Sequence, residues 1–221
     1  MSDSFRDRQD AGKRLGEALK ERRVGAATVL AIPRGGVPVA VEVADVLGVP
    51  LDLAVTRKIP VPFNTEAGYG AVAEDGTVFL NERMVRALAL RQSDIEAGTQ
   101  AVLEEIGRRS SLYRKILPVQ TVKDRAAIIV DDGLASSGFT MVAAIKSVRQ
   151  RGAKRTIVAS PVASGEAYDM LEPIADEIVC LVISRSYPFA VASFYDNWYD
   201  LDDDEVMKYL RDWQRKTLTR N

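Results

Sequence analysis

Residues 126–140 read Ala-Ala-Ile-Ile-Val-Asp-Asp-Gly-Leu-Ala-Ser-Ser-Gly-Phe-Thr, and this run constrains the fold more than any other part of the chain. Five apolar residues followed by two acids and a glycine predict a buried strand of a parallel sheet. From Thr140 the apolar residues change to helical spacing, so the turn between strand and helix lies at the carboxyl end of the strand. Its small residues leave backbone N–H groups beside the positive end of the helix dipole, an arrangement that suits a phosphate.

Asp131 and Asp132 need a different role, because carboxylates repel phosphate. Two carboxylates beside a phosphate-binding turn suit the hydroxyls of a sugar or a bound Mg²⁺. Acid pairs at strand ends also occur in receiver domains and in Mg²⁺-dependent phosphatases, and a Gly/Ser turn can simply cap a helix. A sugar phosphate would satisfy both halves of this site.

Two further strand ends carry cations. Residues 28–40 predict a strand, the turn Pro33-Arg34-Gly35-Gly36 and the start of a helix that reaches about Leu47. In this turn the glycines permit close approach of a ligand, and Arg34 offers hydrogen-bond donors to a polyanion. Residues 51–58 predict a strand that ends in Arg57 and Lys58, at the crevice above an α/β sheet. Either motif alone fits an ordinary loop or a solvated charge pair, whereas three strand ends of complementary charge predict one divided site.

With these motifs the chain resembles the type I phosphoribosyltransferases over most of its length, and more narrowly an uncharacterised branch of predicted phosphoribosyltransferases. The resemblance implies an α/β fold, doubly wound, with a mainly parallel central sheet flanked by helices. It also implies a small hood subdomain and a flexible lid loop. We expect a single domain over residues 1–221, with hood elements from 1–20 and 185–221 and the lid at about 57–80.

The resemblance also implies roles for individual residues. Asp131 and Asp132 would contact the ribose hydroxyls of 5-phosphoribosyl pyrophosphate (PRPP), and Lys58 and Arg57 would neutralise the leaving pyrophosphate during catalysis. The pyrophosphate would be gripped by Arg34, Gly35 and Gly36, with a non-proline cis peptide bond at Arg34–Gly35. The 5′-phosphate would be held by the turn that consists of Gly133, Leu134, Ala135, Ser136, Ser137, Gly138, Phe139 and Thr140.

Magnesium is the cofactor that the resemblance implies. Mg²⁺ would be held through PRPP oxygens and water and not directly by a protein cluster, with Asp131 and Asp132 as the candidate protein ligands. The phosphate turn departs from the family pattern because the Ser136-Ser137 stretch is commonly one residue shorter. Either Ser136 bulges outward and residues 137–140 form the phosphate cup, or the cup is remodelled.

The aromatic segment 187–199 resembles the hood of the purine-using members of the family. By position Phe189 would stack on the base, and Asp196 would accept a hydrogen bond from a base N–H. The structural alternative is that these aromatic side chains pack against the closing helix, expected at residues 202–216. For most of them we expect the packing role, and for Phe189 both remain open.

Composition limits the chemistry and the partners. The 221 residues carry a net charge of −1, which predicts no binding to DNA, and they include no histidine, which excludes Ser-His-Asp and Cys-His triads. The single cysteine, Cys180, lies in an apolar run, so we expect a buried side chain in a reducing cytoplasm. No signal peptide or membrane-spanning run is evident, so no membrane partner is expected. The resemblance implies a homodimer.

Further elements are expected at the N-terminus, in the lid and in the second half of the chain. The patterns predict an amphipathic helix from about Phe5 to Lys20 and a second helix over 93–113. They also predict a hairpin that turns at Asp75-Gly76, which leaves residues 59–70 as a mobile lid loop. Strands are expected at 156–163 and 177–183. Arg6, Asp7 and Arg8, near the start of the first helix, could reach the site, but for this helix we favour a structural role.

The function that these expectations support is the Mg²⁺-dependent transfer of 5-phosphoribose from PRPP to a nitrogenous base, with a purine-like base favoured and pyrophosphate released. The alternative is a non-catalytic regulator that senses PRPP or a nucleotide on the same fold. The presence of Arg34, Arg57 and Lys58 favours catalysis, because a sensor has less need of a lid cation.

Overall fold

The computed structural model describes residues 4–62, 64–135 and 138–219, and a five-stranded parallel sheet forms its centre. The spatial order is β2-β1-β6-β7-β8, and all four neighbouring pairs are parallel. The strands are β1 (Ala27–Ala31), β2 (Leu51–Leu53), β6 (Ala126–Val130), β7 (Arg155–Ser164) and β8 (Glu177–Ser184). The doubly wound α/β fold predicted from the sequence is therefore confirmed.

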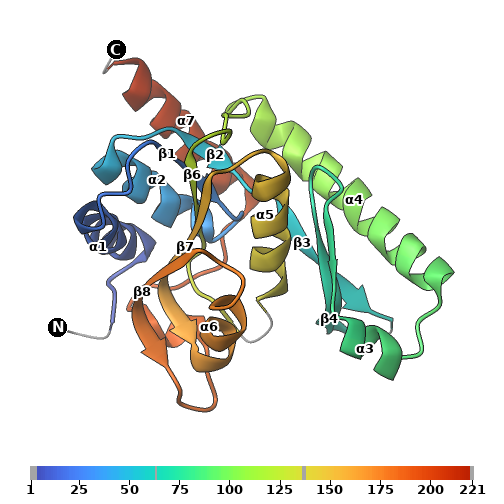
Figure 1. The fold of residues 1–221 in the computed structure, drawn as a ribbon. Helices are drawn as coiled ribbons and strands as arrows, with labels where there is room; N and C mark the ends of the chain where they lie inside the picture. The colour runs from blue at the N-terminus through green and yellow to red at the C-terminus, as the bar shows by residue number, and fades with distance from the viewer. Residues whose placement is uncertain (1–3, 63, 136–137, 220–221) are drawn as a thin grey trace.

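Helices cover both faces of this sheet, which explains why its central strands are apolar on both sides. Val29 and Ile128 face one hydrophobic core together with α1 (Arg8–Glu21), α2 (Gly36–Leu47) and α7 (Asp203–Leu218). Leu30 and Ile129 face a second core with α5 (Phe139–Gln150) and α6 (Gly165–Leu171). In Figure 1, α1 and α2 lie together on one side of the sheet and α5 crosses the other.

A second, antiparallel sheet stands beside the first. It consists of β3 (Thr56–Val61), β4 (Asn64–Ala73) and β5 (Val78–Leu80), with β4 in the middle. The long helix α4 (Gln92–Arg114) runs alongside it, and the short helix α3 (Glu82–Ala87) follows β5 (Figure 1). The predicted hairpin at Asp75-Gly76 is confirmed, and Gly76 supplies the positive φ of 84° that the turn requires.

Two expectations about this region were wrong. The strand expected at 51–58 ends at Leu53, where its pairing with β1 ends, so Arg57 and Lys58 lie on β3 of the antiparallel sheet. Residues 59–70, expected to be a loop, are largely strand, because β3 and β4 pair with each other despite the register shifts at Pro60. Proline lacks the N–H that a ladder needs, which made this stretch look like a loop in the sequence.

The two segments expected to supply the hood meet at one point. The backbone N–H of Phe5 donates to the carbonyl oxygen of Phe194 (2.8 Å), and that of Asp196 donates to the carbonyl oxygen of Phe5 (2.8 Å). The 3₁₀ turn Val191–Phe194 stands at this junction, whereas α1 itself packs on α2. Across the described ranges, we find no helix that combines the length and the apolar character needed to cross a membrane.

Candidate functional site

The site lies where the strand order of the parallel sheet changes direction, between β1 and β6. The chain moves from β1 outward to β2 on one side and from β6 outward to β7 on the other, which opens a crevice at the carboxyl ends of the two strands. Ala31 and Val130 are register partners, and the N–H of Ile32 donates to the carbonyl oxygen of Val130 (2.9 Å). This pairing brings the turn after β1 against the acids after β6.

Glycines allow these two turns to touch. A Cβ on Gly35 would stand 2.0 Å from Oδ2 of Asp132, and one on Gly36 would stand 2.7 Å from the carbonyl oxygen of Val130. Both positions therefore need glycine for close approach. The non-proline cis peptide bond expected at Arg34–Gly35 lies one residue earlier, at Pro33–Arg34. A cis bond before a residue other than proline has no local sequence signal, so its position was mispredicted.

The acid pair occupies the floor of the crevice. Burial, and secondarily the charge of Asp132, raise the pKa of Asp131 well above the usual range. The carboxylate of Asp132 accepts a hydrogen bond from Nε of Arg8 (2.7 Å), and its carbonyl oxygen accepts one from the hydroxyl of Tyr195 (2.6 Å). The two adjacent acids thus have unlike surroundings, since Asp132 has an arginine partner.

A cavity of about 410 Å³ opens beside the turn Pro33-Arg34-Gly35-Gly36, the predicted pyrophosphate turn, and five cations line it. They come from α1, β3, α4 and the turn after β1: Arg8, Arg34, Arg57, Lys58 and Arg109. Nε of Arg57 lies 2.9 Å from a carboxylate oxygen of Glu105 on α4. So dense a group of positive charges beside two carboxylates suits a pyrophosphate attached to a sugar.

Arg8 and Arg109 were not assigned to the site from the sequence. Each stands on the apolar side of its helix: Arg109 lies three residues after the buried Ile106, and Arg8 lies three residues before the buried Ala11. A cation at helical spacing from buried residues is the signal that could have identified both. Nε of Arg109 lies 3.4 Å from a carboxylate oxygen of Asp203, which orients it from α7.

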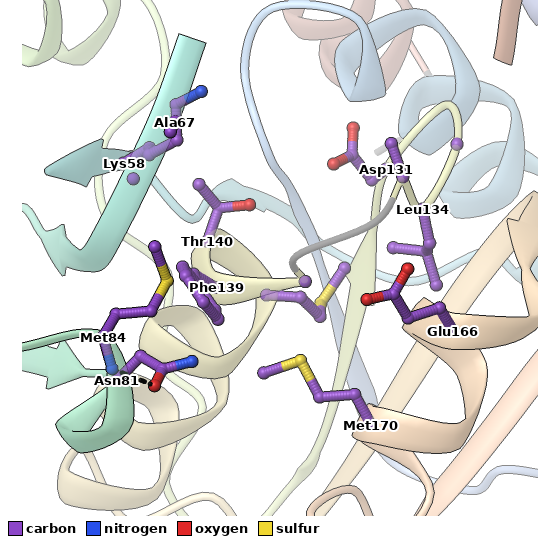
Figure 2. Close-up of a pocket in the computed structure, with 15 residues that line it drawn as sticks. Lys58, Ala67, Asn81, Met84, Asp131, Leu134, Phe139, Thr140, Glu166 and Met170 are labelled. Carbon is purple, nitrogen blue, oxygen red and sulfur yellow. Dashed lines mark hydrogen bonds between the residues drawn. The ribbon is translucent and has the colours of Figure 1, made fainter. Parts of the chain in front are cut away.

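A second cavity, of about 700 Å³, adjoins the predicted phosphate turn. Figure 2 shows Lys58 and Ala67 of the small sheet on one side of it and Asp131, Leu134 and Glu166 on the other. The turn residues that line it are Gly133, Leu134, Ala135, Gly138, Phe139 and Thr140. Lys58, Asp131 and Thr140 line both cavities and so join the two halves of the site.

The phosphate turn leads directly into α5. Gly138 caps the helix with a positive φ of 53°, and Phe139 begins it. The ring of Phe139 is buried and packs on Phe79, with the ring centroids 5.4 Å apart, so its side chain anchors the turn. Ser136 and Ser137, on which the two alternatives for the phosphate cup depend, lie outside the described residues.

The structure does not bring the two candidate base-binding residues to the acid pair. Phe189 packs on Phe194, with centroids 5.6 Å apart, and lines a separate cavity of about 480 Å³. Asp196 is exposed, and its backbone N–H bonds to Phe5. From the same C-terminal segment, Val191 and Trp198 do line the cation-rich cavity, and Val191 leaves no room for a side chain on Gly133.

The donor set for a metal is small. In the part of the chain that the structure describes, no three or more Asp, Glu or Cys side chains gather in a way that could hold a metal ion, and the sequence has no histidine. Three acids line the cation-rich cavity, Asp131, Asp132 and Asp200, and the first two are adjacent in the sequence. Such a pair suits Mg²⁺ that keeps most of its shell as water and ligand oxygens.

Comparison with known proteins agrees with this geometry. Residues 4–196 match the family model described as the phosphoribosyl transferase domain. A curated Mycobacterium tuberculosis protein, provisionally named as a phosphoribosyl transferase, is 40% identical over 206 residues, which are 93% of this chain and 46% of that protein. The chain thus spans about half the length of the curated relatives that it matches.

Solved structures show the same fold. A crystal structure of a protein from Thermus thermophilus superposes with a TM-score of 0.82 and 38% identity, covering 95% of this chain and 99% of that one. A Neisseria gonorrhoeae protein, crystallised with bound ppGpp, superposes with a TM-score of 0.51 at 15% identity. The superposition covers 95% of this chain and 93% of that one, and at this identity it shows a shared fold and nothing more. From the family model and the identity to its relatives, this chain belongs to the phosphoribosyl transferase domain family.

Proposed function

We propose that this protein transfers the 5-phosphoribosyl group of PRPP to a nitrogenous base and releases pyrophosphate. The observation that supports the proposal is that two cavities meet at Asp131, with the glycine-containing turn before α5 on one side and Asp132 and five cations on the other. PRPP has the matching order of groups: a 5′-phosphate, a ribose with free hydroxyls and a pyrophosphate.

The residues divide the work of the reaction. The turn from Gly133 to Thr140 would hold the 5′-phosphate, and Asp131 and Asp132 would accept hydrogen bonds from the ribose hydroxyls. As the bond between ribose C1 and the pyrophosphate oxygen breaks, the leaving group takes the electron pair and gains negative charge. Lys58, Arg57 and Arg34 would stabilise that charge, which is the main requirement of an oxocarbenium-like transition state. A nitrogen lone pair of the base then forms the new bond at C1.

Magnesium fits this site as a partner of PRPP. Asp131 and Asp132 would hold it together with oxygens of PRPP and water, and the ion would supply further positive charge to the pyrophosphate. Asp132 also contacts Arg8, so it reaches the ligand with one of its two oxygens already engaged.

The acceptor is proposed to be a purine-like base beneath the C-terminal segment. Support comes from Val191 and Trp198, an apolar and an aromatic side chain among the residues that line the cation-rich cavity. A homodimer is proposed from the family resemblance. A cytoplasmic location is proposed from the single cysteine, Cys180, because burial raises the pKa of its thiol to about 11.

The test is to incubate the protein with Mg²⁺, PRPP and a panel of nucleobases and to measure pyrophosphate release, while PRPP binding is followed by calorimetry. We expect release that depends on one base, and we expect the double variant Asp131→Ala, Asp132→Ala to lose PRPP binding. PRPP binding without release from any base would favour the sensor. Unchanged affinity in the double variant would overturn the site assignment.

A further inference from the structure

Arg8 makes three contacts at once, each in a different direction. Its Nε donates to Oδ2 of Asp132 at 2.7 Å, and its Nη1 donates to the carbonyl oxygen of Tyr199 at 2.8 Å. The face of its guanidinium lies over the ring of Trp198, 3.9 Å from the centroid. The side chain is 7% exposed, so this arrangement is almost fully removed from water.

These contacts determine how the Asp132 carboxylate is presented. The oxygen that Arg8 engages, Oδ2, is also the atom packed closest to Gly35 of the pyrophosphate turn. The backbone carbonyl of Asp132 is held as well, because the hydroxyl of Tyr195 donates a hydrogen bond to it. The other carboxylate oxygen is therefore the one left for a ligand, and its direction is set by the guanidinium.

A cation is also needed here for an electrostatic reason. Asp131 and Asp132 are adjacent, and two carboxylates in a partly buried crevice repel each other. Arg8 is the ion-pair partner that the described residues give to Asp132. Arginine suits the position better than lysine, because its planar fork can bond in two directions while its face rests on an aromatic ring.

We propose that Arg8 is a positioning residue of the PRPP site: it holds Asp132 in the orientation that accepts a ribose hydroxyl, and Trp198 and Tyr199 hold Arg8. The inference rests on the proposed function. It assigns the first helix and the segment before α7 a part in substrate binding, although Arg8 lies 124 residues from Asp132 and 191 residues from Tyr199 along the chain.

A purely structural role for Arg8 is the competing interpretation, and the same helix offers the matched control. Arg14 also lies over an aromatic ring, that of Phe5 at 4.5 Å, and donates to a backbone carbonyl, that of Ser4 at 2.9 Å. Arg14 thus joins α1 to the N-terminal residues Ser4 and Phe5, and its ion-pair partner among the described residues is Asp10 of the same helix (4.0 Å). Removing it tests the anchoring contribution alone.

The experiment measures PRPP affinity by calorimetry and the KM for PRPP and kcat by pyrophosphate release, for wild type and for the variants Arg8→Ala, Arg8→Lys and Arg14→Ala. Thermal unfolding of each variant reports its folding. We expect Arg8→Ala to weaken PRPP binding and raise KM by about 10- to 100-fold, the loss typical of a charge-assisted hydrogen bond, with a smaller change in kcat. Arg8→Lys should recover part of the affinity, and Arg14→Ala should bind as wild type does.

A double-mutant cycle then asks whether Arg8 acts through Asp132. If it does, Arg8→Ala should weaken PRPP binding little further once Asp132→Asn is present. Additive losses would mean that Arg8 contacts the ligand directly and would overturn the positioning role. Affinity in Arg8→Ala equal to that in Arg14→Ala would overturn it as well. If Arg8→Ala does not fold, wild-type affinity in Arg8→Lys gives the same negative answer. Failure of wild type to bind PRPP would instead overturn the proposed function itself.

Discussion

Gly35 shows most directly how the geometry of the candidate site depends on a single residue. Its Cα lies so close to the Asp132 carboxylate that an added Cβ would stand 2.0 Å from Oδ2. Gly35→Ala should therefore push the carboxylate away from its position beside Arg8 and weaken PRPP binding by at least about tenfold, since a displaced acceptor loses a charge-assisted hydrogen bond. Calorimetric titration with PRPP measures the loss.

The control for this variant is another Gly→Ala change in open space. Gly107 lies on α4, and a Cβ there would meet no atom within 4 Å. Gly107→Ala should leave PRPP affinity unchanged and favour the helix slightly. If Gly35→Ala binds PRPP as tightly as Gly107→Ala does, the pyrophosphate turn and the acid pair do not cooperate in the way the geometry indicates.

At the scale of elements, the hairpin of the small sheet is tied to α5 through its turn. Asp75 accepts a hydrogen bond from the hydroxyl of Ser147 on α5 (2.6 Å) and another from the N–H of Thr77 (3.0 Å). Burial opposes ionisation of Asp75, but these hydrogen bonds outweigh it and lower its pKa. Ser147→Ala should cost about 1 kcal/mol in the free energy of unfolding, measured with urea at neutral pH.

This cost should depend on pH in a definite direction. Because the folded pKa of Asp75 is depressed, its contribution is complete above the unfolded pKa of about 3.9 and is lost as pH falls through the folded value. The difference between wild type and Ser147→Ala should therefore shrink below about pH 4. Ser111→Ala on α4, where the hydroxyl bonds only to the carbonyl of Gly107 in the described bonds, should show no such dependence. A difference that stays constant down to pH 3 would argue against the Asp75 contact.

At the scale of the whole molecule, one buried acid connects the two sheets and two helices. Asp52 on β2 is fully buried and pairs with Arg114, near the end of α4, and with Arg151, directly after α5 (2.9 Å). Arg114 also pairs with Glu74 beside the hairpin turn. Asp52→Asn should destabilise the protein by about 3 kcal/mol, because two largely buried guanidinium groups lose their common partner.

An exposed ion pair provides the comparison for Asp52. Asp212 and Arg215 pair on the outer face of α7, with side chains 51% and 75% exposed. Asp212→Asn should change the free energy of unfolding by less than about 0.5 kcal/mol in guanidinium chloride titrations, since water already solvates both groups. Equal effects of the two substitutions would show that the Asp52 cluster does not join the sheets.

The sequence by itself determined the local units of this protein. The apolar runs of β1 and β6, the acids that follow β6 and the glycine turn after β1 are encoded within a few residues each, so strand, turn and helix could be predicted there from period and composition. The doubly wound sheet follows from the alternation of such units, because parallel strands need helical crossovers.

The tertiary structure alone decided which distant residues meet. Arg8 and Arg109 join the cation-rich cavity only because α1 and α4 pack beside the crevice, and Phe189 lies away from it because its ring packs on Phe194. Arg57 and Lys58 lie on a strand of the second sheet because the pairing of β2 with β1 ends at Leu53 and β3 begins at Thr56. Contacts of this kind depend on packing between elements far apart in the chain. A local pattern can place a cation on the buried side of a helix, but it does not show which distant residue that cation will contact.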